Sequence, residues 1–180
     1  IVSFLISLSF RLYISFTNST LSSDESYFNL RLTEHIIKDK TPLSYDELSY
    51  SGRDLIQPQG FNYFLALFSF IPSYSKIIPA ILSSLIILIV YLISKKITKD
   101  EVSSLFSASL SAFIPIEIIT TINQLSVYSL IIPVILLMIL SLLSLEENKY
   151  FILFIILSFI LPLIHPISIL FAFSLLFYLI

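Results

Sequence analysis

Apolar residues along this chain fall into six long stretches, separated by short polar turns and by one long polar segment near the start. A helix needs about 20 apolar residues to cross the hydrocarbon core of a bilayer. The pattern therefore predicts six membrane-spanning helices. A shorter apolar stretch at 61–70 is interpreted as a re-entrant or interfacial helix, because it is too short to cross. The predicted spans cover about 1–16, 77–94, 102–120, 125–145, 150–163 and 167–180.

The first apolar stretch has a second interpretation. A secretory signal peptide is also apolar, N-terminal and short. No small-residue cleavage site follows this stretch, however, and Arg11 lies deep inside it, so we favour a spanning helix. The chain begins with Ile1 rather than methionine, and its last apolar stretch has no polar flank. We therefore expect the sequence to be a piece of a longer protein.

The polar segment, residues 18–57, is predicted to contain a helix of its own. Ser22 or Ser23 can cap a helix that opens on two acidic residues, which favour a helix N-terminus. The helix is expected to cover 24–39 and to end before Pro42, because the residue preceding a proline disfavours helical backbone. Its apolar residues spread over a broad arc, which favours a position on the membrane surface.

The composition of the chain indicates the class of protein to which this pattern belongs. Hydrophobic residues make up 57% of the chain and charged residues 12%, whereas soluble domains carry about 25% charged residues. We therefore expect an all-α integral membrane protein, with a polytopic bundle of transmembrane helices forming one domain over 1–180. The chain has no cysteine, which excludes disulfides and thiolate metal sites. The net charge of −2 gives no reason to expect nucleic acid as a partner.

Charge also predicts an orientation. The segment 18–57 contains seven acidic and four basic residues, whereas the short turn after the 77–94 stretch holds Lys95, Lys96 and Lys99. Basic residues in short loops mark the cytoplasmic side of a membrane protein. The lysine turn is therefore predicted to be cytoplasmic and the 18–57 loop external. The turns near Glu117 and near His165 then fall on the external side as well.

The external segment carries an ordered set of short motifs, with DESYFNLR at 24–31, SGR at 51–53, and then Pro58. In this order the motifs resemble the first external loop of GT-C glycosyltransferases. The YFN-x-R portion is most similar to the catalytic subunit of oligosaccharyltransferase. Arg11, near the end of the first stretch, and the IPA motif at 78–80 are also common in this superfamily. The resemblance covers about the first 120 residues of the chain.

The resemblance implies a transmembrane bundle of GT-C type and a glycosyltransferase activity. Such an enzyme transfers a sugar or oligosaccharide from a polyprenyl-phosphate or pyrophosphate donor to a protein or glycan acceptor at the external face. It would do so by inverting displacement. Other parts of a longer chain complete the acceptor site in such enzymes, so we expect these 180 residues alone to be inactive.

Four loop residues become candidate site residues on this basis. Asp24 or Glu25 would act as general base on the acceptor, or as ligands of a divalent cation such as Mg²⁺ or Mn²⁺. Glu25 matches the position of the oligosaccharyltransferase aspartate, while other GT-C loops favour Asp24. Of the two we prefer Asp24. Arg31 and Arg53 are candidates for binding the carrier phosphate, because charge develops on that group during transfer.

One departure from the oligosaccharyltransferase pattern affects this site. A second acidic motif is expected in the next external turn, but 118–126 contains no acidic residue, and Glu117 precedes the expected place. Either the enzyme is metal-independent, or Glu117 substitutes, or catalysis has been lost. Glu117 is a functional candidate because ionisable groups are costly within a membrane; it is merely interfacial if its helix ends earlier. Arg11 is expected to reach the interface or to pair with a loop carboxylate.

Each candidate also has a structural interpretation. The acidic pair Asp24 and Glu25 suits any helix N-terminus, Arg31 and Arg53 have acidic neighbours to pair with, and a lone histidine such as His165 more often caps a helix than binds a ligand.

Two rival functions remain. A transporter or flippase places ionisable residues at mid-membrane depth, whereas these spans are nearly free of charge. A noncatalytic GT-C relative, serving as an accessory subunit, would explain the missing acidic motif.

Overall fold

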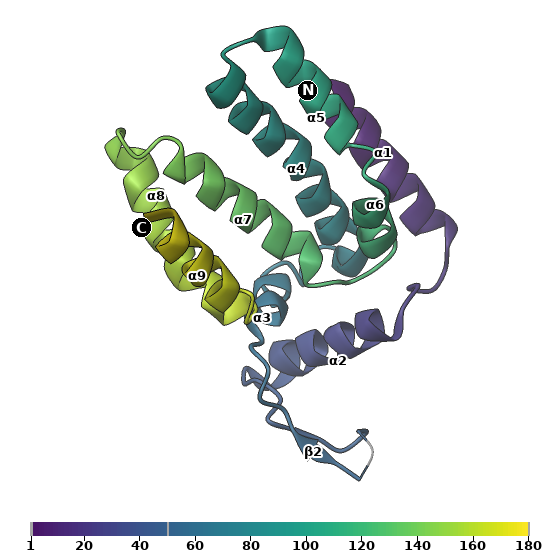
Figure 1. Ribbon diagram of the computed structural model, residues 1–180. Helices are drawn as coiled ribbons and strands as arrows, with labels where there is room; N and C mark the ends of the chain where they lie inside the picture. The colour runs from purple at the N-terminus through teal and green to yellow at the C-terminus, as the bar shows by residue number, and fades with distance from the viewer. Residues whose placement is uncertain (1, 50, 180) are drawn as a thin grey trace.

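The computed structural model describes residues 2–49 and 51–179, and these residues form nine helices and one two-stranded hairpin. The predicted all-α class is confirmed. Most helices lie side by side in a bundle, with α2 and the hairpin beyond one end of it (Figure 1). The helices are α1 (Val2–Thr17), α2 (Asp24–Asp39), α3 (Gly60–Ala66), α4 (Tyr74–Thr98), α5 (Glu101–Ser111), α6 (Pro115–Thr121), α7 (Tyr128–Leu142), α8 (Asn148–Ile164) and α9 (Ser168–Leu179), and the strands are β1 (Tyr45–Asp46) and β2 (Arg53–Asp54).

Helix α4 is the central element of the bundle and packs against α1, α5 and α7. Its 25 residues span about 38 Å at 1.5 Å per residue, which exceeds the roughly 30 Å of a bilayer's hydrocarbon core. The predicted 77–94 segment lies inside it, and this helix is long and apolar enough to cross a membrane.

The span predicted over 102–120 is interrupted in the structure. Helices α5 and α6 occupy this range and are bent by 47° relative to each other. The break falls where Ile114 has an extended ψ of 114° immediately before Pro115, because a residue before proline disfavours helical backbone. The helix expected over 125–145 likewise starts later, at Tyr128. The preceding connection, 122–127, includes Asn123 with a left-handed φ of 53°.

The remaining apolar helices are shorter. Helices α1, α7 and α8 contain 16, 15 and 17 residues, or about 23–26 Å each. Among the described residues, one helix has the length and apolar character of a membrane span, or two when the bent pair α5–α6 is taken as one. The outermost residues of the spans predicted at 1–16 and 167–180, residues 1 and 180, lie outside the described residues.

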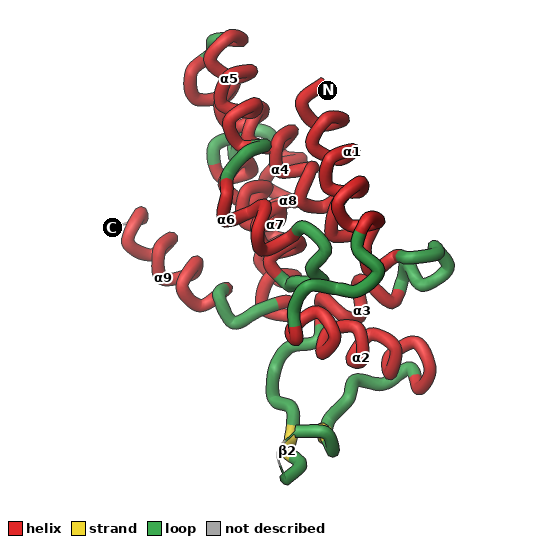
Figure 2. The backbone as a smooth tube through the Cα atoms, turned by 90° about the vertical axis from the view of Figure 1, so that its right-hand side faces the viewer, coloured by secondary structure: helices red, strands yellow, loops and turns green. Residues whose placement is uncertain are grey.

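Helix α2 has the bounds that the sequence predicts. The Ser23 side chain accepts a hydrogen bond from the backbone N–H of Ser26 at 3.2 Å, and Lys40 ends the helix in a left-handed conformation. The buried face of α2 packs on α3 and presents polar residues as well as Leu32 and Ile36. Figure 2 shows α2 running across the end of the bundle. This face of α2 is therefore covered by protein.

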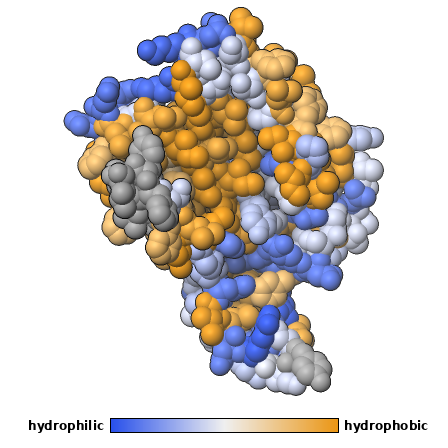
Figure 3. Space-filling model, in the orientation of Figure 1, coloured by the Kyte–Doolittle hydropathy of each residue, from blue (hydrophilic) through white to orange (hydrophobic). Residues whose placement is uncertain are grey.

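The core at this end joins α3, α7 and α8 through fully buried Phe61, Leu65 and Leu125, together with Ile131 and Leu161. On the face of the bundle seen in Figure 3 the surface is mostly apolar, and hydrophilic residues lie mainly toward the two ends. Large apolar side chains exposed on the bundle include Leu5, Phe106, Phe113, Phe159 and Leu163. An exposed apolar surface of this extent is typical of a partner or lipid contact.

Candidate functional site

A cavity of about 340 Å³, lined by polar as well as apolar groups, lies at the end of the bundle, where α2, the start of α3, the start of α7 and the α8–α9 junction meet. Two of the sequence-predicted site residues, Glu25 and His165, line it together although they lie far apart in the chain. Aromatic and amide side chains complete most of the wall. The lining residues are Glu25, Phe28, Asn29, Gln57, Pro58, Asn62, Val127, Tyr128, Ile164, His165 and Pro166.

Glu25 is held in place by the connection between α6 and α7. Ser126 donates a hydrogen bond from its hydroxyl to Glu25 Oε1 at 3.2 Å. The next residue of α2, Ser26, accepts one from the backbone N–H of Leu125 at 2.9 Å. Asn29 donates to the Leu125 carbonyl, also at 2.9 Å. The first turn of α2 is thus fixed against the 122–127 connection, and Glu25 is placed at the edge of the cavity.

Asn29 and Asn62, which line the cavity from α2 and α3, link these two helices. Asn62 donates from its side-chain amide to the Asn29 carbonyl at 3.0 Å, and both side chains are buried. Sequence reasoning did not assign Asn62, Ser126 or Tyr128 to the site. The motif YFN-x-R did contain Asn29, whose buried amide is satisfied by its hydrogen bond to the Leu125 carbonyl.

One ring nitrogen of His165 accepts a hydrogen bond from the loop that carries the histidine. The backbone N–H of Ile167 donates to His165 Nδ1 at 3.1 Å. The ring lies beside Tyr128, with centroids 6.1 Å apart. The expectation that a lone histidine makes a local capping contact is therefore confirmed for Nδ1. The same side chain also lines the cavity, so the two interpretations of His165 are compatible.

A second, larger cavity of about 870 Å³ opens next to the polar one. The two share Gln57, Pro58 and Ile164 as lining residues. The larger cavity is mostly apolar, and its walls come from α3, α7, α8 and the base of the hairpin. Its apolar lining includes Leu43, Leu55, Phe64, Leu130, Val134, Leu157, Ile160 and Leu163. The pair of cavities suits an amphiphile whose chain fills the apolar part and whose head group reaches Glu25 and His165.

Gly60 allows the close contact on which both cavities depend. A Cβ atom at this position would lie 2.3 Å from the backbone oxygen of Leu163 in α8. Gly60 is the first residue of α3, so the absence of a side chain brings the start of α3 directly against the end of α8. Nearby, Gln59 binds the hairpin base by donating to the Leu43 carbonyl at 2.6 Å and by accepting from the Leu43 N–H at 3.2 Å.

Arg31 lies in a different cluster, next to the cavity. It pairs with the buried Asp46 of β1 at 2.8 Å, and its guanidinium lies 5.5 Å from the ring centroid of Phe28, a cavity residue. Ser49 donates a hydrogen bond to the Asp46 carboxylate at 2.5 Å. This bond, together with Arg31, holds the pKa of Asp46 below its ordinary value. Arg31 therefore has the acidic partner that its structural interpretation expects.

Two of the remaining loop candidates lie outside the cavity lining. Arg53 is exposed on β2, where the strand register places it opposite Asp46. Asp24, the first residue of α2, is also exposed, and it is not among the residues that line the cavity. Both Asp24 and Glu25 are exposed, and Glu25 alone of the two lines the cavity, together with His165. Arg31 pairs with Asp46, and Arg53 lies opposite Asp46 in the hairpin.

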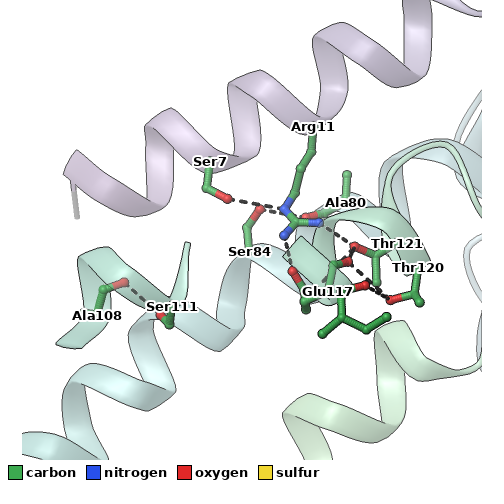
Figure 4. A network of polar contacts seen from close by, with 10 residues as sticks. Ser7, Arg11, Ala80, Ser84, Ala108, Ser111, Glu117, Thr120 and Thr121 are labelled. Atoms are coloured by element: carbon green, nitrogen blue, oxygen red, sulfur yellow. Dashed lines mark hydrogen bonds and ion pairs between the residues drawn. The ribbon is translucent and has the colours of Figure 1, made fainter. Parts of the chain in front are cut away.

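Arg11 and Glu117 form a buried ion pair between α1 and α6 (Figure 4). Their exposed fractions are 2% and 5%. Arg11 also donates to Thr121 at 2.5 Å and to Ser7 at 3.3 Å. The expectation that Arg11 pairs with a loop carboxylate is therefore wrong: its partner is on α6, because α1 and α6 are brought together inside the bundle. Glu117 is engaged in this pair and is not a lining residue of the Glu25 cavity.

A divalent cation would find one carboxylate among the described lining residues, that of Glu25. No group of three or more histidine, aspartate or glutamate side chains with metal-binding geometry is present in 2–49 and 51–179. Mg²⁺ is commonly held by one or two carboxylates together with substrate phosphates and water. Glu25 fits the part of one ligand in such an arrangement, so a divalent cation stays a prediction.

Comparison of the chain with protein-family models, curated proteins and solved structures finds no match. The similarity of residues 24–31 to GT-C enzymes therefore stays a prediction. The paired cavities, with Glu25 and His165 at their polar end, are the structural feature from which a function is proposed.

Proposed function

We propose that this chain belongs to a membrane glycosyltransferase of GT-C type. Its substrate would be a sugar or oligosaccharide carried on a polyprenyl phosphate or pyrophosphate, transferred to a protein or glycan acceptor on the external face. One observation supports this above the others: a cavity lined by polar and apolar residues, Glu25 and His165 among them, opens beside a larger and more apolar cavity. A polyprenyl-linked sugar has the same division into an apolar chain and a polar head.

The proposal includes a multi-pass arrangement in the bilayer. Helix α4 would cross it fully, the bent pair α5–α6 would form a second span, and the shorter α1, α7, α8 and α9 would cross with them. The α4–α5 turn carries Lys95, Lys96 and Lys99 at one end of the bundle, while α2, α3 and the hairpin lie at the other (Figure 1). With basic residues on the cytoplasmic side, the cavities and the 18–57 loop are external.

Glu25 is the carboxylate that the geometry favours for chemistry. A carboxylate within reach of the acceptor can remove its proton as the acceptor attacks the sugar carbon and the phosphate leaves. The hydrogen bond from Ser126 fixes one carboxylate oxygen, so the group is oriented before substrate binds. Asn29, Gln57 and Asn62 supply amide donors and acceptors for sugar hydroxyls. A bound cation would neutralise charge on the leaving phosphate.

The other candidate residues have weaker support. Asp24 lies outside the cavity lining, so the earlier preference for it gives way to Glu25. Arg31 is paired with Asp46, and Arg53 is exposed on the hairpin. A role for either arginine with the carrier phosphate would require that this loop change its contacts when the donor binds.

The test is sugar transfer in membranes from cells that express the whole reading frame. The donors would be polyprenyl phosphates that carry tritium-labelled hexoses. The variants compared with the wild type would be Glu25→Gln and Asp24→Asn. Loss of a general base lowers the rate by about 10²–10⁴-fold, so we expect Glu25→Gln to be nearly inactive and Asp24→Asn to retain most activity. Glu34→Gln, an exposed acid on the same helix, is the matched control. Full activity of Glu25→Gln would refute the assignment.

A noncatalytic, lipid-binding accessory subunit is the second candidate. It is favoured by the observation that Glu25 is the one carboxylate among the described cavity residues, with Glu117 committed to Arg11. An accessory subunit would bind the polyprenyl carrier equally well before and after Glu25→Gln, and no variant of the cavity would change the chemical step of sugar transfer.

A further inference from the structure

We propose that His165 recognises the phosphate group of the bound amphiphile through a hydrogen bond donated by Nε2–H. This inference rests on the proposed function, because it assumes an amphiphilic phosphate ligand. It assigns a ligand contact to a residue that has only a local capping contact within the described protein. Two features of His165 support this contact: the tautomer of its ring and its place between the two cavities.

The tautomer is set by the backbone. A neutral imidazole has one N–H donor and one acceptor nitrogen. Because Ile167 donates its N–H to Nδ1 at 3.1 Å, Nδ1 is the acceptor and Nε2 carries the proton. Pro166 has no N–H of its own, so Ile167 supplies the first backbone donor after the histidine. The neutral ring is therefore held with its donor edge away from its own loop.

The position of His165 suits a phosphate rather than a sugar hydroxyl. Ile164, the preceding residue, lines both cavities, so His165 follows directly on the boundary between the apolar and polar parts. In a polyprenyl-linked sugar the phosphate is the group at this boundary. A phosphate close to the carboxylate of Glu25, which lines the same cavity, would be repelled in the absence of a bound cation. The donor of His165 comes from the α8–α9 junction rather than from α2, and it favours the boundary position.

Two substitutions separate the ligand contact from the local capping contact. In His165→Asn, the side-chain oxygen takes the place of Nδ1 and keeps an acceptor for Ile167, but the donor at the Nε2 position is lost. In His165→Gln, the longer amide places a donor near the Nε2 position, and the capping acceptor is lost. His35→Asn is the matched control, since His35 lies on α2 and pairs with Asp39 instead.

The probes are farnesyl phosphate and farnesol, bound to the protein in lipid nanodiscs and measured by native mass spectrometry. The decisive quantity is the ratio of the two affinities, because it cancels effects on the apolar cavity. A hydrogen bond to a charged group is worth about tenfold or more in affinity, so His165→Asn should lower the ratio by that factor. His165→Gln and His35→Asn should leave it near the wild-type value.

Three outcomes would overturn the proposal. These are an unchanged ratio in His165→Asn, a ratio that falls as far in His165→Gln as in His165→Asn, and equal binding of the two probes by the wild type. In each of these cases the amphiphile site itself still stands, because farnesol binding reports on it independently. Failure of the wild type to bind either probe would instead refute the proposed function.

Discussion

The buried pair between Arg11 and Glu117 gives the sharpest stability prediction. Replacing Glu117 by alanine leaves the guanidinium of Arg11, which is 2% exposed, with Thr121 and Ser7 as its hydrogen-bond partners and with no counter-charge. Removing one partner of a buried ion pair destabilises a protein by about 3–5 kcal/mol. We therefore expect Glu117→Ala to lower the free energy of unfolding by about this amount.

Two further variants show whether charge or packing is responsible. In Glu117→Gln the amide oxygen still accepts from Arg11, so the loss should be smaller than in Glu117→Ala. In the double variant Arg11→Met with Glu117→Leu, both charges are removed together. Replacing a buried pair by apolar residues of similar volume is often neutral or stabilising, so the double variant should be close to wild type.

The assay is unfolding by sodium dodecyl sulfate in lipid bicelles, followed by far-ultraviolet circular dichroism. Glu101→Ala is the control, because Glu101 pairs with Lys95 at 3.9 Å on the surface and its loss should change little. A cost below about 1 kcal/mol for Glu117→Ala, the range of exposed ion pairs, would refute the burial argument. So would a double variant that loses as much stability as Arg11→Met and Glu117→Leu lose in sum, because additive losses mean that the two charges are not coupled.

Two other predictions follow from the site. Gly60→Ala should separate α3 from α8, since its Cβ would lie 2.3 Å from the Leu163 oxygen. It should weaken farnesol binding to the apolar cavity by native mass spectrometry, and unchanged binding would show that the backbone adjusts freely. The hairpin should also respond to pH. The pKa of Asp46 is lowered by its bonds to Ser49 and Arg31, so its stabilising effect is present above the unfolded pKa of about 3.9 and is lost as the pH falls through the lower folded value. The protection of the Leu48 amide, which donates to Asp46 at 3.1 Å, is measured by hydrogen exchange relative to the intrinsic rate at each pH. This protection should therefore fall in acid, and Asp46→Asn should abolish its pH dependence.

Local rules account well for the parts of the fold that depend on neighbouring residues. The bounds of α2 follow from a serine cap and two acidic residues at its start, and the prediction matches the structure from Asp24 to Asp39. The break between α5 and α6 was also encoded locally, by Pro115. It was missed because the apolar run continues through the proline, and hydrophobicity alone does not register the loss of helical backbone before it.

Contacts between distant residues account for what the sequence did not reveal. The pairing of Arg11 with Glu117 and the meeting of Glu25 with His165 depend on how the helices pack, and neither residue type nor spacing specifies a partner so far along the chain. The connection 122–127 is a clearer example. The sequence shows no acidic motif in it, yet its Leu125 and Ser126 hold the first turn of α2.

This connection also relates the buried ion pair to the candidate site. Glu117 and Thr121 of α6 are bound to Arg11, and two residues after Thr121 the Asn123 side chain donates to the Thr20 carbonyl at 2.7 Å. The connection then reaches Ser126, which donates to Glu25. The backbone of 117–126 therefore joins the buried ion pair to the cavity wall, with side chains bound to α1 at one end and to α2 at the other. Because α6 is short and separated from α5 by a bend, its ion pair with Arg11 adds to the contacts that it makes with α4 and α7.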